Sequence, residues 1–160
     1  MNMRFIKMNV FLLFCVIINS SLIFANDNEW GGKCFEYFKA SGQTIANTST
    51  YCKGGVGNKC FMTFVNSQFS MFAAAENCNE RVGDRCFDVA ISNGNSLSVS
   101  AKLCKNVVST SCLESYLNAK TLSLASIAVE CKGDISAPCF LGYLKEGSTL
   151  KRAAANCRGF

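Results

Sequence analysis

Residues 34–60 read CFEYFKASGQTIANTSTYCKGGVGNKC, a stretch in which two cysteines 18 residues apart are followed by a third after eight more. The same spacing recurs along the chain, with a single gap of 19 in place of 18. It places ten cysteines: Cys34, Cys52, Cys60, Cys78, Cys86, Cys104, Cys112, Cys131, Cys139 and Cys157. The chain therefore contains five copies of a unit of about 26 residues. Internal repetition at this period predicts a quasi-linear array in which each copy contacts only its neighbours.

Residues 1–25 have the features of a secretory signal peptide. Arg4 and Lys7 precede an almost wholly apolar run, and the small residue Ala25 is followed by polar residues. We expect cleavage near Ala25, a secreted or periplasmic mature chain, a lead-in over 26–33 and no membrane-spanning segment after the leader. An uncleaved leader that anchors the chain in a membrane is the alternative. Ten cysteines in an exported chain, an even number, predict disulfides rather than a metal site.

The first half of each copy has the pattern of a short helix. Large apolar side chains stand one residue after the first cysteine, at Phe35, Phe61, Phe87, Leu113 and Phe140. Four residues after it stand Phe38, Phe64, Ala90, Tyr116 and Tyr143, which share the same helical face. Eight residues after it come Gly42, Gln68, Gly94, Lys120 and Gly147. The three glycines are typical of a left-handed residue that ends a helix.

The second half of each copy predicts another helix, which begins almost at once. A hydroxyl residue stands eight residues before the second cysteine in every copy: Thr44, Ser70, Ser96, Ser123 and Thr149. Such a side chain accepts a hydrogen bond from an unpaired amide of the first helical turn. Apolar residues seven before the cysteine and small residues three before it complete one stripe with it. The stripe predicts a helix that ends near the second cysteine.

Together these patterns predict an all-α fold: a tandem array, or short α-solenoid, of five disulfide-stapled helical hairpins. The copies begin at residues 34, 60, 86, 112 and 139, and the repeat domain covers 34–160. The one extra residue falls at Thr121–Leu122, inside the predicted turn of the fourth hairpin. A turn is where a hairpin tolerates such an insertion.

Two disulfide pairings fit hairpins whose cysteines all lie at one edge. Pairing within copies joins Cys34 to Cys52 and so on, whereas pairing across the connectors joins Cys52 to Cys60. Loop entropy barely separates them, at about 3 kcal/mol for the longer loop and about 2.5 kcal/mol for the shorter. The connector pairing strands Cys34 and Cys157 as free thiols, while the within-copy pairing uses all ten cysteines. We therefore prefer within-copy disulfides and keep connector disulfides as the alternative.

The seven-residue connectors, such as 53–59 between Cys52 and Cys60, resemble those of the secreted cysteine-rich Sel1-like αα-repeat proteins. The resemblance covers the leader and the cysteine spacing. The period is shorter here, and the longer alanine, leucine, glycine and tyrosine signature of those repeats is absent. The resemblance implies connector disulfides and a role in protein interaction, and it transfers no catalytic residue.

The residue content gives catalysis little support. The chain has no histidine, which removes the commonest general base and metal ligand, and every cysteine after the leader belongs to the repeat. A two-carboxylate hydrolase needs acids that converge in a cleft, yet the acidic residues fall at different positions in different copies. We predict that the protein is not an enzyme and that it uses no cofactor or metal.

Cations flank the cysteines at the shared edge of the copies. They form a candidate polyanion-binding edge of Lys33, Lys53, Lys59, Arg85, Lys105, Lys132 and Arg158. Stacked copies would align these cations beside an acidic glycan or another polyanion. After the leader, 14 basic residues face 11 acidic ones, and this mild balance argues against a nucleic-acid partner. Solubility alone is the competing interpretation.

The second copy carries a surplus of large apolar side chains. They form a candidate partner patch of Phe61, Met62, Phe64, Phe69 and Phe72. A surplus beyond the needs of two short helices predicts a protein-binding surface, and packing between copies is the competing interpretation. We expect a non-enzymatic binding or structural module whose partner is another protein or an extracellular glycan. The alternative is a defence or virulence protein that binds polyanions or membrane surfaces through the basic edge.

Overall fold

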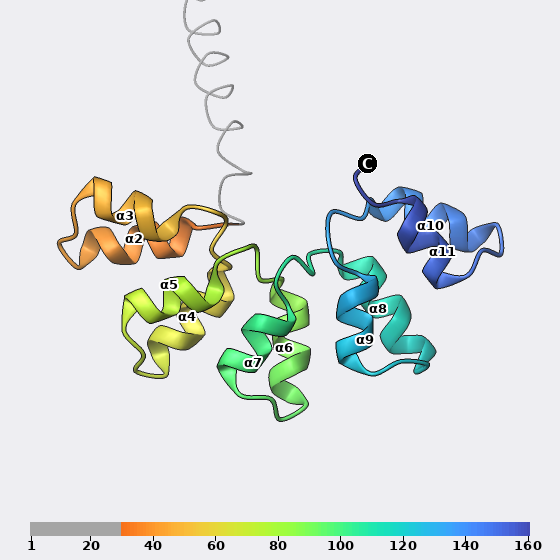
Figure 1. Ribbon diagram of the computed structural model, residues 1–160, viewed down its shortest axis with the longest axis horizontal. Helices are drawn as coiled ribbons and strands as arrows, with labels where there is room; N and C mark the ends of the chain where they lie inside the picture. The colour runs from red at the N-terminus through yellow and green to blue at the C-terminus, as the bar shows by residue number, and fades with distance from the viewer. Residues whose placement is uncertain (1–29) are drawn as a thin grey trace, which may run out of the picture.

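The computed structural model describes residues 30–160, and the predicted leader lies outside this range. The described chain folds into α2 (Gly32–Ala40), α3 (Ile45–Cys52), α4 (Asn58–Asn66), α5 (Met71–Cys78), α6 (Asp84–Ser92), α7 (Leu97–Leu103), α8 (Thr110–Ala119), α9 (Leu124–Glu130), α10 (Ala137–Lys145) and α11 (Leu150–Asn156). Successive helices form five hairpins along an arc, with the hairpin turns outward and the connectors on the inner side (Figure 1). The predicted tandem array of helical hairpins is confirmed.

Local hydrogen bonds set the helix ends. The side-chain oxygen of each predicted hydroxyl cap accepts a hydrogen bond from the backbone N–H three residues later; the caps are Thr44, Ser70, Ser96, Ser123 and Thr149. The first helix of every copy ends within two residues of a residue with positive φ: Gly42, Gln68, Gly94, Lys120 and Gly147. The left-handed end is thus present in all five copies, including the two that lack a glycine.

The disulfides lie within the copies, as we preferred. They join Cys34 to Cys52, Cys60 to Cys78, Cys86 to Cys104, Cys112 to Cys131 and Cys139 to Cys157. Each ties the start of a first helix to the end of a second helix, with Cα atoms 5.5–5.7 Å apart. The connector disulfides implied by the resemblance to Sel1-like proteins are therefore wrong for this chain. Five disulfides indicate that the fold belongs to an oxidising compartment.

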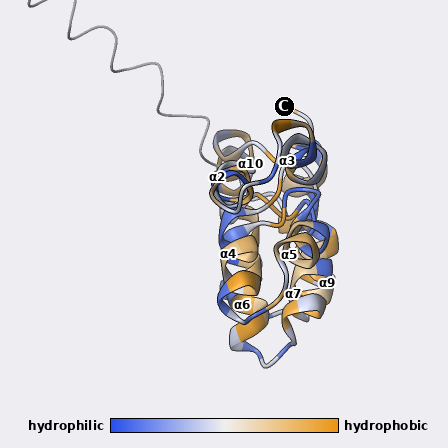
Figure 2. Ribbon diagram, turned by 90° about the vertical axis from the view of Figure 1, so that its left-hand side faces the viewer, coloured by the Kyte–Doolittle hydropathy of each residue, from blue (hydrophilic) through white to orange (hydrophobic). Residues whose placement is uncertain are grey.

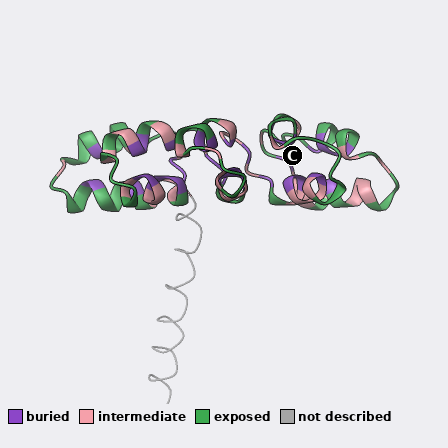
Figure 3. Ribbon diagram, turned by 90° about the horizontal axis from the view of Figure 1, so that it is seen from below, coloured by how far each residue is buried: buried purple, intermediate pink, exposed green. Residues whose placement is uncertain are grey.

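Neighbouring hairpins pack in two layers, one of first helices and one of second helices (Figure 2). The residue directly after the first cysteine is buried at Phe61, Phe87, Leu113 and Phe140, and Phe61 packs against Tyr37 and Phe38 of the preceding copy. In the first copy, which has no preceding hairpin, the equivalent Phe35 is 41% exposed. Buried residues gather on the facing sides of the two layers (Figure 3). Helices this short are unstable alone, so each hairpin depends on side chains of a neighbouring hairpin to bury its apolar face.

The connectors pack against one another on the inner side of the arc. We term them the hub, made of residues 30–31, 53–59, 79–85, 105–111, 132–138 and 158–160. Short antiparallel bridges join Trp30 to Gly57, Val82 to Lys105 and Ile135 to Arg158. A Cβ on Gly57 would lie 2.6 Å from the carbonyl oxygen of Val82, and one on Gly83 would lie 1.8 Å from that of Val107. Glycine is therefore required where the next connector crosses.

Arg81 ties distant parts of the hub together. Its guanidinium lies over the Trp30 ring, 5.3 Å from the ring centre, and donates a hydrogen bond of 2.8 Å to the Asp134 carboxylate. The hydrogen bond from Arg81 lowers the pKa of Asp134. Trp30 precedes the first copy and Asp134 lies between the fourth and fifth, so the arc curves enough for both to meet Arg81. None of the helices within residues 30–160 is both long and apolar enough to cross a membrane.

Candidate functional site

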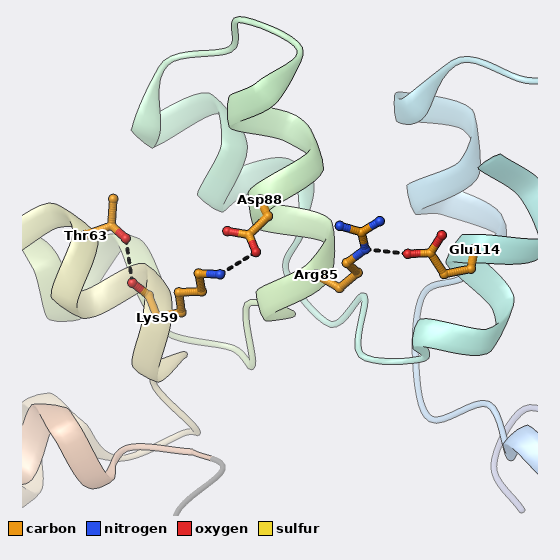
Figure 4. Close-up of polar contacts among 5 residues, drawn as sticks. All are labelled: Lys59, Thr63, Arg85, Asp88 and Glu114. Atoms are coloured by element: carbon orange, nitrogen blue, oxygen red, sulfur yellow. Dashed lines mark hydrogen bonds and ion pairs between the residues drawn. The ribbon is translucent and has the colours of Figure 1, made fainter. Parts of the chain in front are cut away.

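Two cations of the predicted basic edge form ion pairs with acids of the next copy (Figure 4). The Lys59 ammonium contacts the Asp88 carboxylate, and the Arg85 guanidinium contacts that of Glu114. In both pairs the cation directly precedes a first cysteine, and the acid stands two residues after the first cysteine of the next copy. The hydrogen bond and charge of Glu114 raise the pKa of Arg85. These cations therefore serve contacts between neighbouring hairpins.

Other cations of the edge also have internal partners. Lys33 pairs with Glu36 of its own first helix at 2.9 Å, since the next copy has Met62 in place of an acid. Lys105 donates hydrogen bonds of 2.9 Å to Glu80 and to the side-chain oxygen of Asn79. Four of the seven predicted cations thus face a carboxylate. A further one, Arg158, donates to the backbone carbonyl of Glu130 at 2.9 Å.

The predicted aromatic patch is split between core and surface. Phe61 and Phe64 are fully buried, which corrects their assignment to a partner surface, and Met62 is half-buried. Phe69 is exposed and stacks edge-on against Phe64, with ring centres 5.1 Å apart. Phe61 and Phe64 therefore belong to the core, and Phe69 covers Phe64 from the surface.

The remaining member of the patch, Phe72, packs back onto the first copy. Its ring meets Phe38 edge-on at 5.3 Å and Tyr51 at 4.9 Å. Phe72 and Tyr51 stay partly exposed, and they cover the buried Phe38 from α3 and α5. The surplus of aromatic side chains is thus largely used in packing between the first two copies.

The surface is hollowed between the second helices of copies three and four. Elsewhere second helices pack directly on one another, as α3 does on α5, α5 on α7 and α9 on α11, whereas α7 and α9 approach at fewer points. The result is a solvent-open groove of about 480 Å³. Its lining residues are Val99, Lys102, Leu103, Lys105, Ala125, Ala128, Val129 and Lys132. The extra residue of the fourth copy lies in the hairpin that forms one wall of this groove.

The walls of the groove are apolar and exposed. Val99 on α7 is 51% exposed and Val129 on α9 is 71% exposed. Ala125 and Ala128 leave room for the backbone of another element to approach between them. Val129 stands where the first three copies carry Thr50, Glu76 and Lys102. An alignment of the copies therefore shows an unusual apolar residue at this position, and our sequence analysis did not single it out.

Three lysines form the rim of the groove at its hub end. Lys102 lies in the last turn of α7, and Lys105 and Lys132 directly follow the cysteines that end α7 and α9. Lys105 is held by Glu80, but within residues 30–160 neither Lys102 nor Lys132 pairs with a carboxylate. The predicted basic edge thus contributes two of its members to the groove, and Lys102 joins them.

The described residues contain no group of three acidic, cysteine or histidine side chains placed to hold a metal ion. A comparison with known proteins finds no matching family model, no matching curated protein and no matching solved structure. The function is therefore inferred from the geometry of this surface alone.

Proposed function

We propose that the chain is an exported, non-enzymatic binding module and that its partner is another protein. The observation that carries this proposal is the groove between α7 and α9, which keeps two valine side chains more than half exposed. Beside them stand Lys102 and Lys132, which pair with no carboxylate of the described residues. Exposed apolar surface of this kind is costly unless it is covered by a partner. A groove between two helices is also a common site for a partner segment.

Export is supported by the leader and by the disulfides. Residues 1–25 carry the order of charge, apolar run and small residue of a signal peptide. Disulfides persist in secreted and periplasmic proteins and are rare where thiols are kept reduced. We therefore place the mature protein outside the cytoplasm, after cleavage near Ala25.

Binding of a polyanion along the basic edge is the less favoured function. Four of its cations already face carboxylates, so few are available to an acidic glycan. The mature protein should therefore leave a heparin column at low salt. Retention beyond about 0.3 M salt would favour the polyanion function instead, because such binding scales with the number of free cations.

A photo-crosslinking side chain in place of Val129 tests the proposed function. In the cells that export the protein, it should form an adduct with one identifiable protein. The matched control carries the same side chain at Leu141 on α10, which is 45% exposed and lies outside the groove. Adding Val99→Asp should abolish the adduct at Val129. Equal adducts at both positions, or adducts insensitive to Val99→Asp, would overturn the assignment of the groove.

A further inference from the structure

We infer that the groove binds a short amphipathic helix of the partner, with acidic residues in its first turn, lying antiparallel to α7 and α9. This inference rests on the proposed function and adds the chemistry and direction of the partner segment. It follows from the shape of the groove, from the position of its lysines and from the electrostatics of helix ends.

The shape of the groove suits a helix of about two turns. Its walls, α7 and α9, have seven residues each and are therefore about 10 Å long. Both helices run from the hairpin turns on the outer side of the arc toward the hub, so they are roughly parallel to each other (Figure 1). Throughout the rest of this layer, each second helix is packed by another helix. A partner helix would extend that packing over Val99, Val129 and the alanines between them.

The lysines define the charge of the partner and where that charge lies. Lys102, Lys105 and Lys132 all stand at the hub end of the groove. Val99 and Ala125 line it nearer the N-terminal ends of α7 and α9. Glu76 borders Lys102 on the α5 side, but the two do not come within ion-pair distance. Carboxylates of a partner at the hub end would therefore meet Lys102 and Lys132, which pair with no carboxylate of residues 30–160, beside Lys105, which Glu80 already holds. The other end of the partner is left to apolar contacts.

Helix electrostatics then select the direction. Acidic residues stabilise the first turn of a helix and destabilise the last, because the N-terminal end carries partial positive charge. A partner with its first turn at the hub places its acids beside the lysines without weakening its own helix. It also sets its positive end beside the negative C-terminal ends of α7 and α9. In the reverse direction, the acids beside the lysines would stand in the last turn of the partner helix, where they would destabilise it.

A peptide display library tests this inference on the full mature protein. Helix-stabilised peptides of 12 residues, randomised at positions i, i+3, i+4 and i+7, are offered with acids in the first turn, with acids in the last turn, or with none. We expect the first format to be enriched and its best members to bind at least about tenfold more tightly than the others. Enrichment of the last-turn format would overturn the direction, and enrichment of the uncharged format would overturn the role of the lysines.

Charge exchange provides the second arm. Lys102→Glu with Lys132→Glu should weaken the selected peptide about tenfold, and a peptide with lysines in its first turn should regain binding to this variant. The control is Lys145→Glu on α10, which lies outside the groove and should leave the dissociation constant unchanged.

The outcomes separate this inference from the proposed function. Loss of the Val129 adduct together with failure of every peptide would reject both. A persistent adduct without peptide binding would reject the helix and keep a protein partner. Palmitate that binds with the same dependence on Lys102 and Lys132, while all peptides fail, would assign the groove to an anionic amphiphile instead.

Discussion

Gly83→Ala is the sharpest test of the hub. Gly83 caps the N-terminus of α6 with φ −67° and ψ 123°, a conformation that alanine adopts without strain. Its amide donates a hydrogen bond of 3.1 Å to the carbonyl of Cys104, and the residue is buried. A Cβ there would lie 1.8 Å from the carbonyl oxygen of Val107 and 2.8 Å from its carbonyl carbon. Any effect of the substitution therefore reports contact between connectors and not backbone strain.

The expected cost follows from that contact. Real Cβ atoms essentially never approach closer than 3.0 Å, so the connector that holds Val107 must retreat by about 1.2 Å from the 1.8 Å contact. Overpacking of this kind costs about 1–3 kcal/mol, and loss of the hydrogen bond to Cys104 adds about 1 kcal/mol. We expect Gly83→Ala to lower the free energy of unfolding by about 2–4 kcal/mol.

The matched control is Gly142→Ala in α10, where a Cβ meets no atom of residues 30–160 within 4 Å. The same chemical change should here raise the free energy of unfolding by about 0.5–1 kcal/mol, because glycine is a poor helix former. Both variants are compared with the wild type by guanidinium unfolding with the disulfides intact. Hydrogen exchange should show lost protection in 79–85 and 105–111 for Gly83→Ala alone. A Gly83→Ala protein within about 0.5 kcal/mol of the wild type would refute the close packing of the hub.

Three further predictions test other contacts. Replacing Cys60 and Cys78 together by alanine should cost about 3 kcal/mol, because their disulfide closes an 18-residue loop, and a loss below about 1 kcal/mol in denaturant unfolding would contradict this. Tyr116→Phe should leave the unfolding free energy unchanged or raise it, since the buried Tyr116 hydroxyl has no hydrogen-bond partner within residues 30–160; a loss above about 1 kcal/mol would argue against that geometry. The lowered pKa of Asp134 means that its ionised form stabilises the fold above the pKa of the unfolded chain, and that this contribution disappears as the pH falls through the lower folded-state pKa. Asp134→Asn should thus be less stable than the wild type at pH 7 and equal to it in acid, and a gap that is constant with pH would contradict the contact with Arg81.

The helix ends show how far the sequence pattern reaches. The hydroxyl caps of the second helices were predictable in every copy, because a cap bonds an amide only three residues away. The left-handed ends at Gln68 and Lys120 were less evident, since neither residue has the freedom of glycine. There the tight turn between two helices imposes the conformation that glycine supplies in the other copies.

The fate of the cations depended on contacts that are distant in the sequence. From the sequence we expected Lys59 and Arg85 to belong to an unpaired basic edge. In the structure each forms an ion pair with an acid 29 residues further along the chain. Asp88 and Glu114 both stand two residues after the first cysteine of their copies, which we overlooked when we described the acids as falling at different positions. Only the stacking of the hairpins shows that each faces the cation of the preceding copy. Val129 was the one sign of the groove in the sequence, because the groove itself arises where α7 and α9 approach at fewer points than the other neighbouring second helices do.

The amino-acid sequence by itself determined the repeat, the two helices of each copy and their start and stop points. These follow from hydrophobic periodicity and from hydrogen bonds between residues a few positions apart. The tertiary structure alone decided the curvature of the arc, the closeness of the connectors, the partly neutralised edge and the open groove. These depend on how one hairpin lies against the next, and that is set by packing between residues more than 20 positions apart.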